Sequence, residues 1–385
     1  MCDTIEIAKK LIAVDSVTSH SNLEIAELQQ VFLEELGFTV ERLPFRDLHG
    51  TEKVSLAASK LPSVESLKPG IAFFCHNDVV SVDGWSCVHG GPFEAAIADG
   101  RLWGRGACDM KGPTAAALSA LGRLQTQTDH VRAQTAPIHF FVTGDEECGM
   151  AGAKVLVEQS SIFRAMVVSQ PVAVICEPTE LRVVNKHKGG CHFDVSSHGV
   201  AAHSSTGDGL NANWQLIPFL TYLHELSHRC STEAELQNSE FENPTLSLNV
   251  VVVNEPATFN ITVGRAICRI FFRPMPGTAW ESMLEEIKRK ARDLELEISS
   301  IRCLQPLCTP ADRPFVKQTL ELAGQDRTYS VGFATDGCCF EDLQNMLVIG
   351  PGSIEQAHRA DEWIDLEQLH RGADLYQRLL EHFSY

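Results

Sequence analysis

Four short, largely apolar runs in this chain each lead into acidic or histidine side chains. The runs are Ile71–Cys75, Ile138–Thr143, Val172–Cys176 and Met346–Ile349, and the side chains that follow are His76, Asp145-Glu146-Glu147, Glu177 and His358. Runs of this length and composition are typical of strands buried in a parallel sheet. Because ligands bind at the carboxyl ends of such strands, we expect these side chains to form one site.

Helix-spaced apolar residues alternate with these runs. They predict helices at Asn22–Leu36, Pro113–Leu124, Ala151–Val157 and Asp365–Phe383, with Asp365 as a candidate N-cap. The alternation of strands and helices favours an α/β fold, a mixed and mostly parallel sheet sandwiched by helices.

The middle of the chain has a different pattern. Strands are predicted at Gly190–Ser197, Leu246–Val253, Arg265–Phe272 and Leu294–Leu304, and amphipathic helices at Leu210–Leu226 and Thr278–Leu294. These elements make a compact α+β unit between Glu177 and His358. We therefore expect an inserted lid domain at 183–304, with the catalytic domain in two parts, 1–182 and 305–385.

The composition indicates which kinds of partner the protein binds and in which cellular compartment it works. The 385 residues carry a net charge of −18, which argues against nucleic acid or an anionic membrane surface as a partner. No run approaches the roughly 20 apolar residues that span a bilayer, and the N-terminus does not resemble a signal peptide. The 13 cysteines include no C-x-x-C pair. An odd number of cysteines without a secretion signal favours reduced thiols in the cytoplasm.

Histidine and carboxylate side chains together match the ligands of a catalytic zinc site. His76 and Glu177 could hold one ion, and Glu147 and His358 a second. Asp109, which lies just before a predicted helix, could bridge the two. Each residue alone has an incidental explanation, and the complete set at strand ends is much more specific than any member.

Two further acids have expected roles in this site. Asp78 lies on the same strand face as His76 and could orient its imidazole, although most His-x-Asp triplets are incidental. Glu146, beside Glu147, could act as a general base toward water activated by the metal. The alternative for Glu146 is a solvated acid, and we favour the base.

The chain resembles the zinc-dependent M20 metallopeptidases and amidohydrolases along essentially its whole length. The matching motifs are His76-Asn77-Asp78, Gly104-Arg105-Gly106 with Asp109-Met110-Lys111-Gly112, Asp145-Glu146-Glu147, Glu177-Pro178-Thr179 and His358. The resemblance implies a zinc-exopeptidase-like fold, two divalent ions (zinc, with cobalt as an alternative), a homodimer formed through the lid and a cis Asp109–Met110 peptide.

Within this family the flanking motifs are most similar to those of the acetylornithine deacetylases. They are Lys186–Gly189, Ala202–Ser205, Arg273–Gly277, Gly350–Ser353 and Gln356–His358, whereas Cys87–Gly91 and Asn254–Thr258 depart from the pattern. The similarity implies hydrolysis of N-acetyl-L-ornithine to L-ornithine and acetate, in arginine biosynthesis. Alternatives are a succinyl-diaminopimelate desuccinylase, an acetylcitrulline deacetylase, another N-acyl amino-acid hydrolase, a peptidase of the family, or a non-catalytic descendant.

The resemblance also implies residues that contact the small N-acylated substrate. His203 matches a lid histidine that donates to the oxyanion, commonly from a partner subunit, although by itself it is typical of a surface turn. Substrate-binding candidates are Asn260, Arg273, Lys188, Gly352 and Ser353. A guanidinium such as that of Arg273 suits a carboxylate, with a surface ion pair as an equal alternative. The amides of Gly350–Ser353 could cradle a carboxylate, or form a plain turn.

Overall fold

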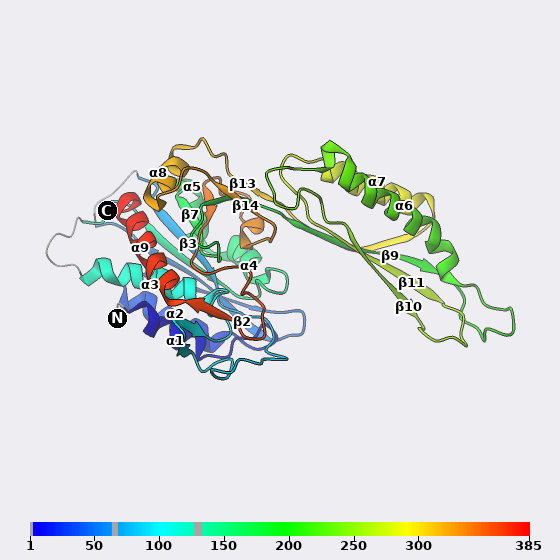
Figure 1. The fold of residues 1–385 in the computed structure, drawn as a ribbon, viewed down its shortest axis with the longest axis horizontal. Coiled ribbons are helices and arrows are strands. Elements are labelled where there is room, and N and C mark those ends of the chain that lie inside the picture. The colour runs from blue at the N-terminus through cyan, green and yellow to red at the C-terminus, as the bar shows by residue number, and fades with distance from the viewer. Residues whose placement is uncertain (1–2, 64–67, 127–132) are drawn as a thin grey trace. The chain divides into compact units, whose positions relative to one another are not determined.

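The computed structural model describes residues 3–63, 68–126 and 133–385, which form two compact units (Figure 1). The first unit comprises residues 1–185, 309–329 and 335–385, and the second comprises residues 186–308 and 330–334. From sequence we placed the insertion at 183–304, and residues 330–334 in the second part of the catalytic domain. A lid or dimerisation role for the second unit stays a prediction.

The first unit is built around a mixed sheet of nine strands in the order β1-β2-β6-β3-β7-β15-β8-β13, with β14 paired to β8. The strands are β1 Thr39–Arg46, β2 Glu52–Lys60, β3 Ile71–His76, β6 Ile138–Thr143, β7 Val172–Ile175, β8 Val184–His187, β13 Leu307–Cys308, β14 Tyr329–Val331 and β15 Met346–Val348. The four predicted apolar runs are its central strands, and adjacent members of β6-β3-β7-β15 pair in parallel. The fold class predicted from sequence is therefore confirmed.

Helices cover both faces of this sheet. They are α1 Thr4–Ile12, α2 Leu23–Glu35, α3 Lys111–Thr126, α4 Ala151–Gln159, α5 Ser161–Ser169, α8 Pro314–Ala323 and α9 Leu366–Phe383. Successive side chains of β3 point to opposite faces. Phe73 contacts Tyr376 of α9, whereas Phe74 stacks on Phe141 and meets Phe163 of α5. Burial on both faces explains why the central strands are apolar throughout.

A small three-stranded sheet lies in the same unit, formed by β4 Ala96–Ala98, β5 Arg101–Trp103 and β16 Trp363–Asp365 in the order β16-β5-β4. After β16 the chain enters α9, and the Asp365 carboxylate accepts the backbone N–H of Glu367, as the predicted N-cap requires. Figure 1 shows α3 and α9 as neighbouring helices of the first unit.

The second unit is an antiparallel sheet in the order β10-β11-β9-β12, packed against two helices. The elements are β9 Gly190–His198, α6 Ala212–Thr232, η1 Ala234–Leu236, β10 Asn249–Glu255, β11 Arg265–Phe272, α7 Trp280–Asp293 and β12 Glu297–Leu304. Strand β10 lies at the sheet edge, and Val251 and Val252 are about half exposed, at 50% and 44%, despite the apolar sequence.

One expectation about the cysteines is wrong in this structure. Cys191 of β9 and Cys303 of β12 are directly paired across the sheet and form a disulfide. Sequence analysis missed it because the two residues are separated by 112 positions and become neighbours only when the strands pair. Across the described part of the chain, we find no helix with the length and apolar character needed to cross a membrane.

Candidate metal centre and active site

Four of the five predicted ligands lie at the end of a parallel strand or after it, and the fifth, Asp109, lies in the loop before α3. His76 ends β3, Glu147 lies in the turn after β6, and Glu177 lies two residues after β7. His358 follows β15 at the end of a turn. Because β6, β3, β7 and β15 are adjacent and parallel, their carboxyl ends meet at one edge of the sheet.

The five predicted ligands lie together at this edge. His76 Nε2 is 3.0 Å from Asp109 Oδ1 and 3.6 Å from Glu177 Oε1. His358 Nε2 is 3.5 Å from Asp109 Oδ2 and 3.0 Å from Glu147 Oε2. The two oxygens of Asp109 therefore face two different histidines, each of which has its own glutamate. This pairing has the arrangement expected of a bridging carboxylate between two ions.

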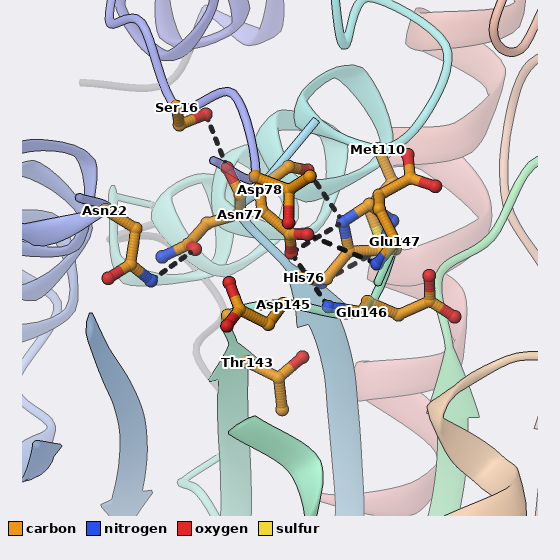
Figure 2. A network of polar contacts seen from close by, with 12 residues as sticks. Ser16, Asn22, His76, Asn77, Asp78, Met110, Thr143, Asp145, Glu146 and Glu147 are labelled. Atoms are coloured by element: carbon orange, nitrogen blue, oxygen red, sulfur yellow. Dashed lines mark hydrogen bonds and ion pairs between the residues drawn. The ribbon is translucent and has the colours of Figure 1, made fainter. Parts of the chain in front are cut away.

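The turn after β6 is held by Asp78, in a way that differs from our expectation (Figure 2). Its carboxylate accepts the backbone N–H groups of Glu146 at 3.1 Å and Glu147 at 3.2 Å. His76 Nδ1 lies 2.9 Å from the backbone oxygen of Asp78 but 3.6 Å from its Oδ1. The main chain thus takes the contact that we expected of the carboxylate, because the carboxylate is occupied by the two amides.

A buried ion pair between Lys53 and Asp145, which was not predicted from sequence, also holds this turn. Lys53 Nζ on β2 lies 2.6 Å from Asp145 Oδ1 and donates to the Thr18 carbonyl at 2.7 Å. Both charged side chains are almost completely buried, at 0% and 1% exposure. Asp145 has a φ of 60°, so the turn places this residue in the left-handed region while Glu146 and Glu147 follow. Nothing in the local sequence marks Lys53 as buried.

A second missed residue, Glu362, holds the loop that carries Asp109. Its buried carboxylate accepts from Arg105 Nη1 at 2.8 Å and from the N–H groups of Gly106, Cys108 and Asp109 at 2.8–3.0 Å. Glu362 lies four residues after His358, so one carboxylate connects the segments that present two predicted ligands. The Asp109–Met110 peptide is cis, as the resemblance implied. In sequence, Glu362 looks like one more acid in a charged segment.

The crowded carboxylates perturb one another electrostatically. Burial raises the pKa of Glu147 to about 7, and the charge of Asp109 adds to this effect. Burial likewise raises the pKa of Glu146 well above its ordinary value, although the nearby His76 opposes it. Burial would lower the pKa of His76, but the hydrogen bond to Asp109 and the charge of Glu177 raise it well above its usual range. An excess of acids around two imidazoles suits divalent cations, and this donor set fits zinc.

The predicted substrate residues fall into separate groups. Gly352 and Ser353 lie in the first unit, where the Ser353 carbonyl accepts from Cys108 Sγ at 3.1 Å. The space beside the Gly352 Cα is filled by Cys108, because a Cβ there would lie 2.7 Å from its sulfur. The loop of Gly352 therefore packs against the segment that presents Asp109.

The remaining four residues lie in the second unit. They form two neighbouring pairs, His203 with Asn260 and Lys188 with Arg273. His203 is exposed and bridges to Ile261, and Ser204 N–H donates to the Asn260 carbonyl at 3.0 Å. Lys188 is buried, and its ammonium donates to the Asn243 and Thr245 carbonyls at 2.7 Å each. Burial and then the charge of Arg273 lower the pKa of Lys188 to about 8. The ammonium of Lys188 therefore already has protein acceptors.

Comparison with known proteins identifies the family. The model of peptidase family M20/M25/M40 matches residues 72–382. The acetylornithine deacetylase of Myxococcus xanthus is 32% identical over 97% of this chain and 96% of its own length. That of Proteus mirabilis is 29% identical over 98% and 96%.

Solved structures agree with this assignment at the level of the fold. An M20 family metallo-carboxypeptidase from Sulfolobus solfataricus superposes with a TM-score of 0.75 at 17% identity, covering 100% of this chain and 99% of its own. A dinuclear metal-binding M20 peptidase from Bacillus subtilis gives a TM-score of 0.65 at 14% identity, covering 98% and 96%. The chain belongs to peptidase family M20/M25/M40 and is a hydrolase of that family.

Proposed function

We propose that this hydrolase removes the acetyl group of N-acetyl-L-ornithine, giving L-ornithine and acetate, and thereby acts in arginine biosynthesis. The curated relatives named acetylornithine deacetylase, which match nearly the whole chain, support this substrate. The observation that carries the hydrolytic chemistry is the position of Asp109 between two histidine–glutamate pairs.

Two divalent cations are proposed as cofactors, with zinc preferred and cobalt as the alternative. His76 and Glu177 would hold one ion, Glu147 and His358 the other, and the two oxygens of Asp109 would contact both. When bound, the ions would polarise the acyl oxygen and make water a better nucleophile near neutral pH.

Glu146 is proposed as the general base. It takes a proton from the attacking water and gives it to the amide nitrogen. The bond between that nitrogen and the acetyl carbon then breaks, and L-ornithine leaves as an amine. Asp78 serves this step indirectly by holding the amides of Glu146 and Glu147. Because both amides bind one carboxylate, the backbone beneath the base is fixed before substrate arrives.

The residues that the resemblance implied for the substrate are proposed as its contacts. The imidazole of His203 and the amide of Asn260 would donate to the developing oxyanion, and the adjacency of their segments supports a shared role. Arg273, Lys188 and the amides of Gly352 and Ser353 are proposed for the substrate carboxylate. For Lys188 the contribution would be its positive charge, since the ammonium is engaged with two carbonyls.

A homodimer through the second unit is proposed as the assembly. Strand β10 supports this proposal, because it is an edge strand among the described residues and partly exposes Val251 and Val252 to solvent. Exposed apolar edge strands pair readily with other chains, and proteins usually protect them.

A hydrolysis panel tests the proposed substrate. Zinc-loaded protein is assayed with N-acetyl-L-ornithine, N-acetyl-L-citrulline, N-succinyl-diaminopimelate and an unblocked dipeptide at equal concentration. The proposal expects the highest kcat/KM for N-acetyl-L-ornithine. A preference for the succinyl substrate, the citrulline derivative or the dipeptide would replace the substrate assignment and leave the metal centre standing.

A further inference from the structure

Helix α6 of the second unit carries two exposed histidines that are not among the proposed catalytic metal ligands. His224 and His228 are four residues apart, and their Nε2 atoms are 3.3 Å from each other. The two rings are almost perpendicular, with an interplanar angle of 89°. Residues at this spacing are neighbours on one face of a helix, so the convergence follows from the position of both residues on α6.

The opposite face of α6 fixes this orientation. Leu223, Leu226 and Cys230 are buried in the core of the second unit, which leaves His224 and His228 directed to solvent. The helix continues to Thr232, so the pair lies on a formed helical turn with its backbone already ordered. Neither imidazole has to leave a packed position in order to bind a ligand.

The positive charge nearest this pair in sequence is already engaged in ion pairs. Arg229 follows His228 directly, but its guanidinium is paired with Glu233 at 2.8 Å and with Glu286 at 2.7 Å. Glu225 is exposed one residue after His224. The positive charge nearest in sequence is therefore balanced by two glutamates.

We propose that His224 and His228 form a surface site for one first-row transition-metal ion, additional to the catalytic centre. Two imidazole nitrogens at i and i+4 of a helix can chelate one ion, and imidazole favours Zn²⁺, Ni²⁺ and Cu²⁺ over Mg²⁺ or Ca²⁺. Water fills the other coordination positions, so binding is reversible and weaker than at a closed site. The ion bound here takes no part in hydrolysis.

Titration with Ni²⁺ tests the site. The full chain, loaded with two equivalents of zinc, is titrated by calorimetry alongside His224→Gln, His228→Gln and the control His370→Gln, which removes an exposed histidine from α9. Wild type and His370→Gln should bind one further ion, and either α6 variant should bind Ni²⁺ at least tenfold more weakly. Amide hydrolysis should be unchanged in all four proteins.

The proposal would be overturned if wild type bound no further Ni²⁺, as expected if the rings only share a hydrogen bond. It would also be overturned if His224→Gln and His228→Gln matched His370→Gln in affinity. Because the variants lie outside the catalytic centre, the comparison among them does not depend on the substrate assignment. Retention of the untagged proteins on an immobilised Ni²⁺ column gives a second readout with the same expected order.

Discussion

The carboxylate of Asp78 accepts the backbone N–H of Glu146 at 3.1 Å, and this contact connects the strand that ends in His76 to the turn that carries the proposed base. Asp78→Asn replaces one acceptor oxygen by an NH₂ group that would face a backbone donor. We expect a fall in kcat of roughly 10²-fold or more, because general-base catalysis depends on position. Zinc content should change little, since the Asp78 side chain is not among the proposed ligands. Steady-state kinetics with metal analysis checks this.

The matched control is Asp83→Asn, a change of the same chemistry at an exposed position five residues later. Its activity should match wild type. If Asp78→Asn were as active as Asp83→Asn, Asp78 would have no positioning role.

Glu362 should determine how firmly Asp109 is presented. Glu362→Gln removes the charge that pairs with Arg105 and leaves buried amide donors with fewer acceptors. We expect a loss of about 3 kcal/mol in the free energy of unfolding and a zinc affinity roughly 10- to 100-fold weaker. Urea unfolding and zinc competition measure the two effects. Glu367→Gln, at an exposed glutamate on α9, should change stability by less than about 0.5 kcal/mol.

Lys53 and Asp145 should be energetically coupled, because each buried charge is compensated by the other. Lys53→Met leaves the Asp145 carboxylate buried without its cation, at a cost of about 3–5 kcal/mol. Adding Asp145→Asn to this variant should recover part of the loss, so a double-mutant cycle should show coupling above about 1 kcal/mol. Arg46→Met, which breaks an exposed pair with Glu52, serves as the control and should cost little. Additive losses at Lys53 and Asp145 would contradict the pairing.

Acid should destabilise the protein partly through His139 on β6. Burial lowers its pKa from 6.5 to about 4, and Nδ1 has no hydrogen-bond partner among the described residues. The unfolded chain therefore binds a proton more readily, and stability falls as the pH drops below 6.5. The contribution lost between pH 8 and pH 5 is about 2 kcal/mol.

His139→Phe should remove this part of the pH dependence, since the ring already stacks beside Phe141. Urea unfolding at pH 8 and pH 5 measures the difference. An unchanged pH dependence in His139→Phe, or an equal flattening in His370→Phe, would show that His139 is not responsible.

The central sheet was predictable because strands buried on both faces leave continuous apolar runs in the sequence. Strands β1 and β2 were not predicted, since polar and charged residues such as Arg42 and Lys53 interrupt their pattern. Lys53 is nevertheless buried, because Asp145 and the Thr18 carbonyl satisfy its ammonium. A hydropathy pattern treats every lysine as exposed and cannot anticipate a partner 92 positions away.

His76, Glu147 and Glu177 were predictable for the same reason, because they lie at or close after the ends of apolar runs. The residues that hold the ligand segments in place, Glu362 and Asp78, were not predictable in the same way. Glu362 binds donors more than 250 residues earlier, and nothing near it in the sequence distinguishes it from the adjacent Asp361. For Asp78, sequence indicated closeness to His76 but not whether the backbone or the carboxylate would make the contact. Strand β10 fails in the opposite direction: its apolar sequence suggested burial, but the structure places it at an exposed edge of the sheet.

Turnover of a zinc-loaded Glu146→Gln variant tests the central claim most directly, using the best substrate of the panel. Glutamine keeps the size of the side chain but cannot accept the proton of the attacking water. The account predicts a wild-type zinc content and a kcat lowered by roughly 10³-fold. Wild-type turnover in a variant with full zinc would contradict it.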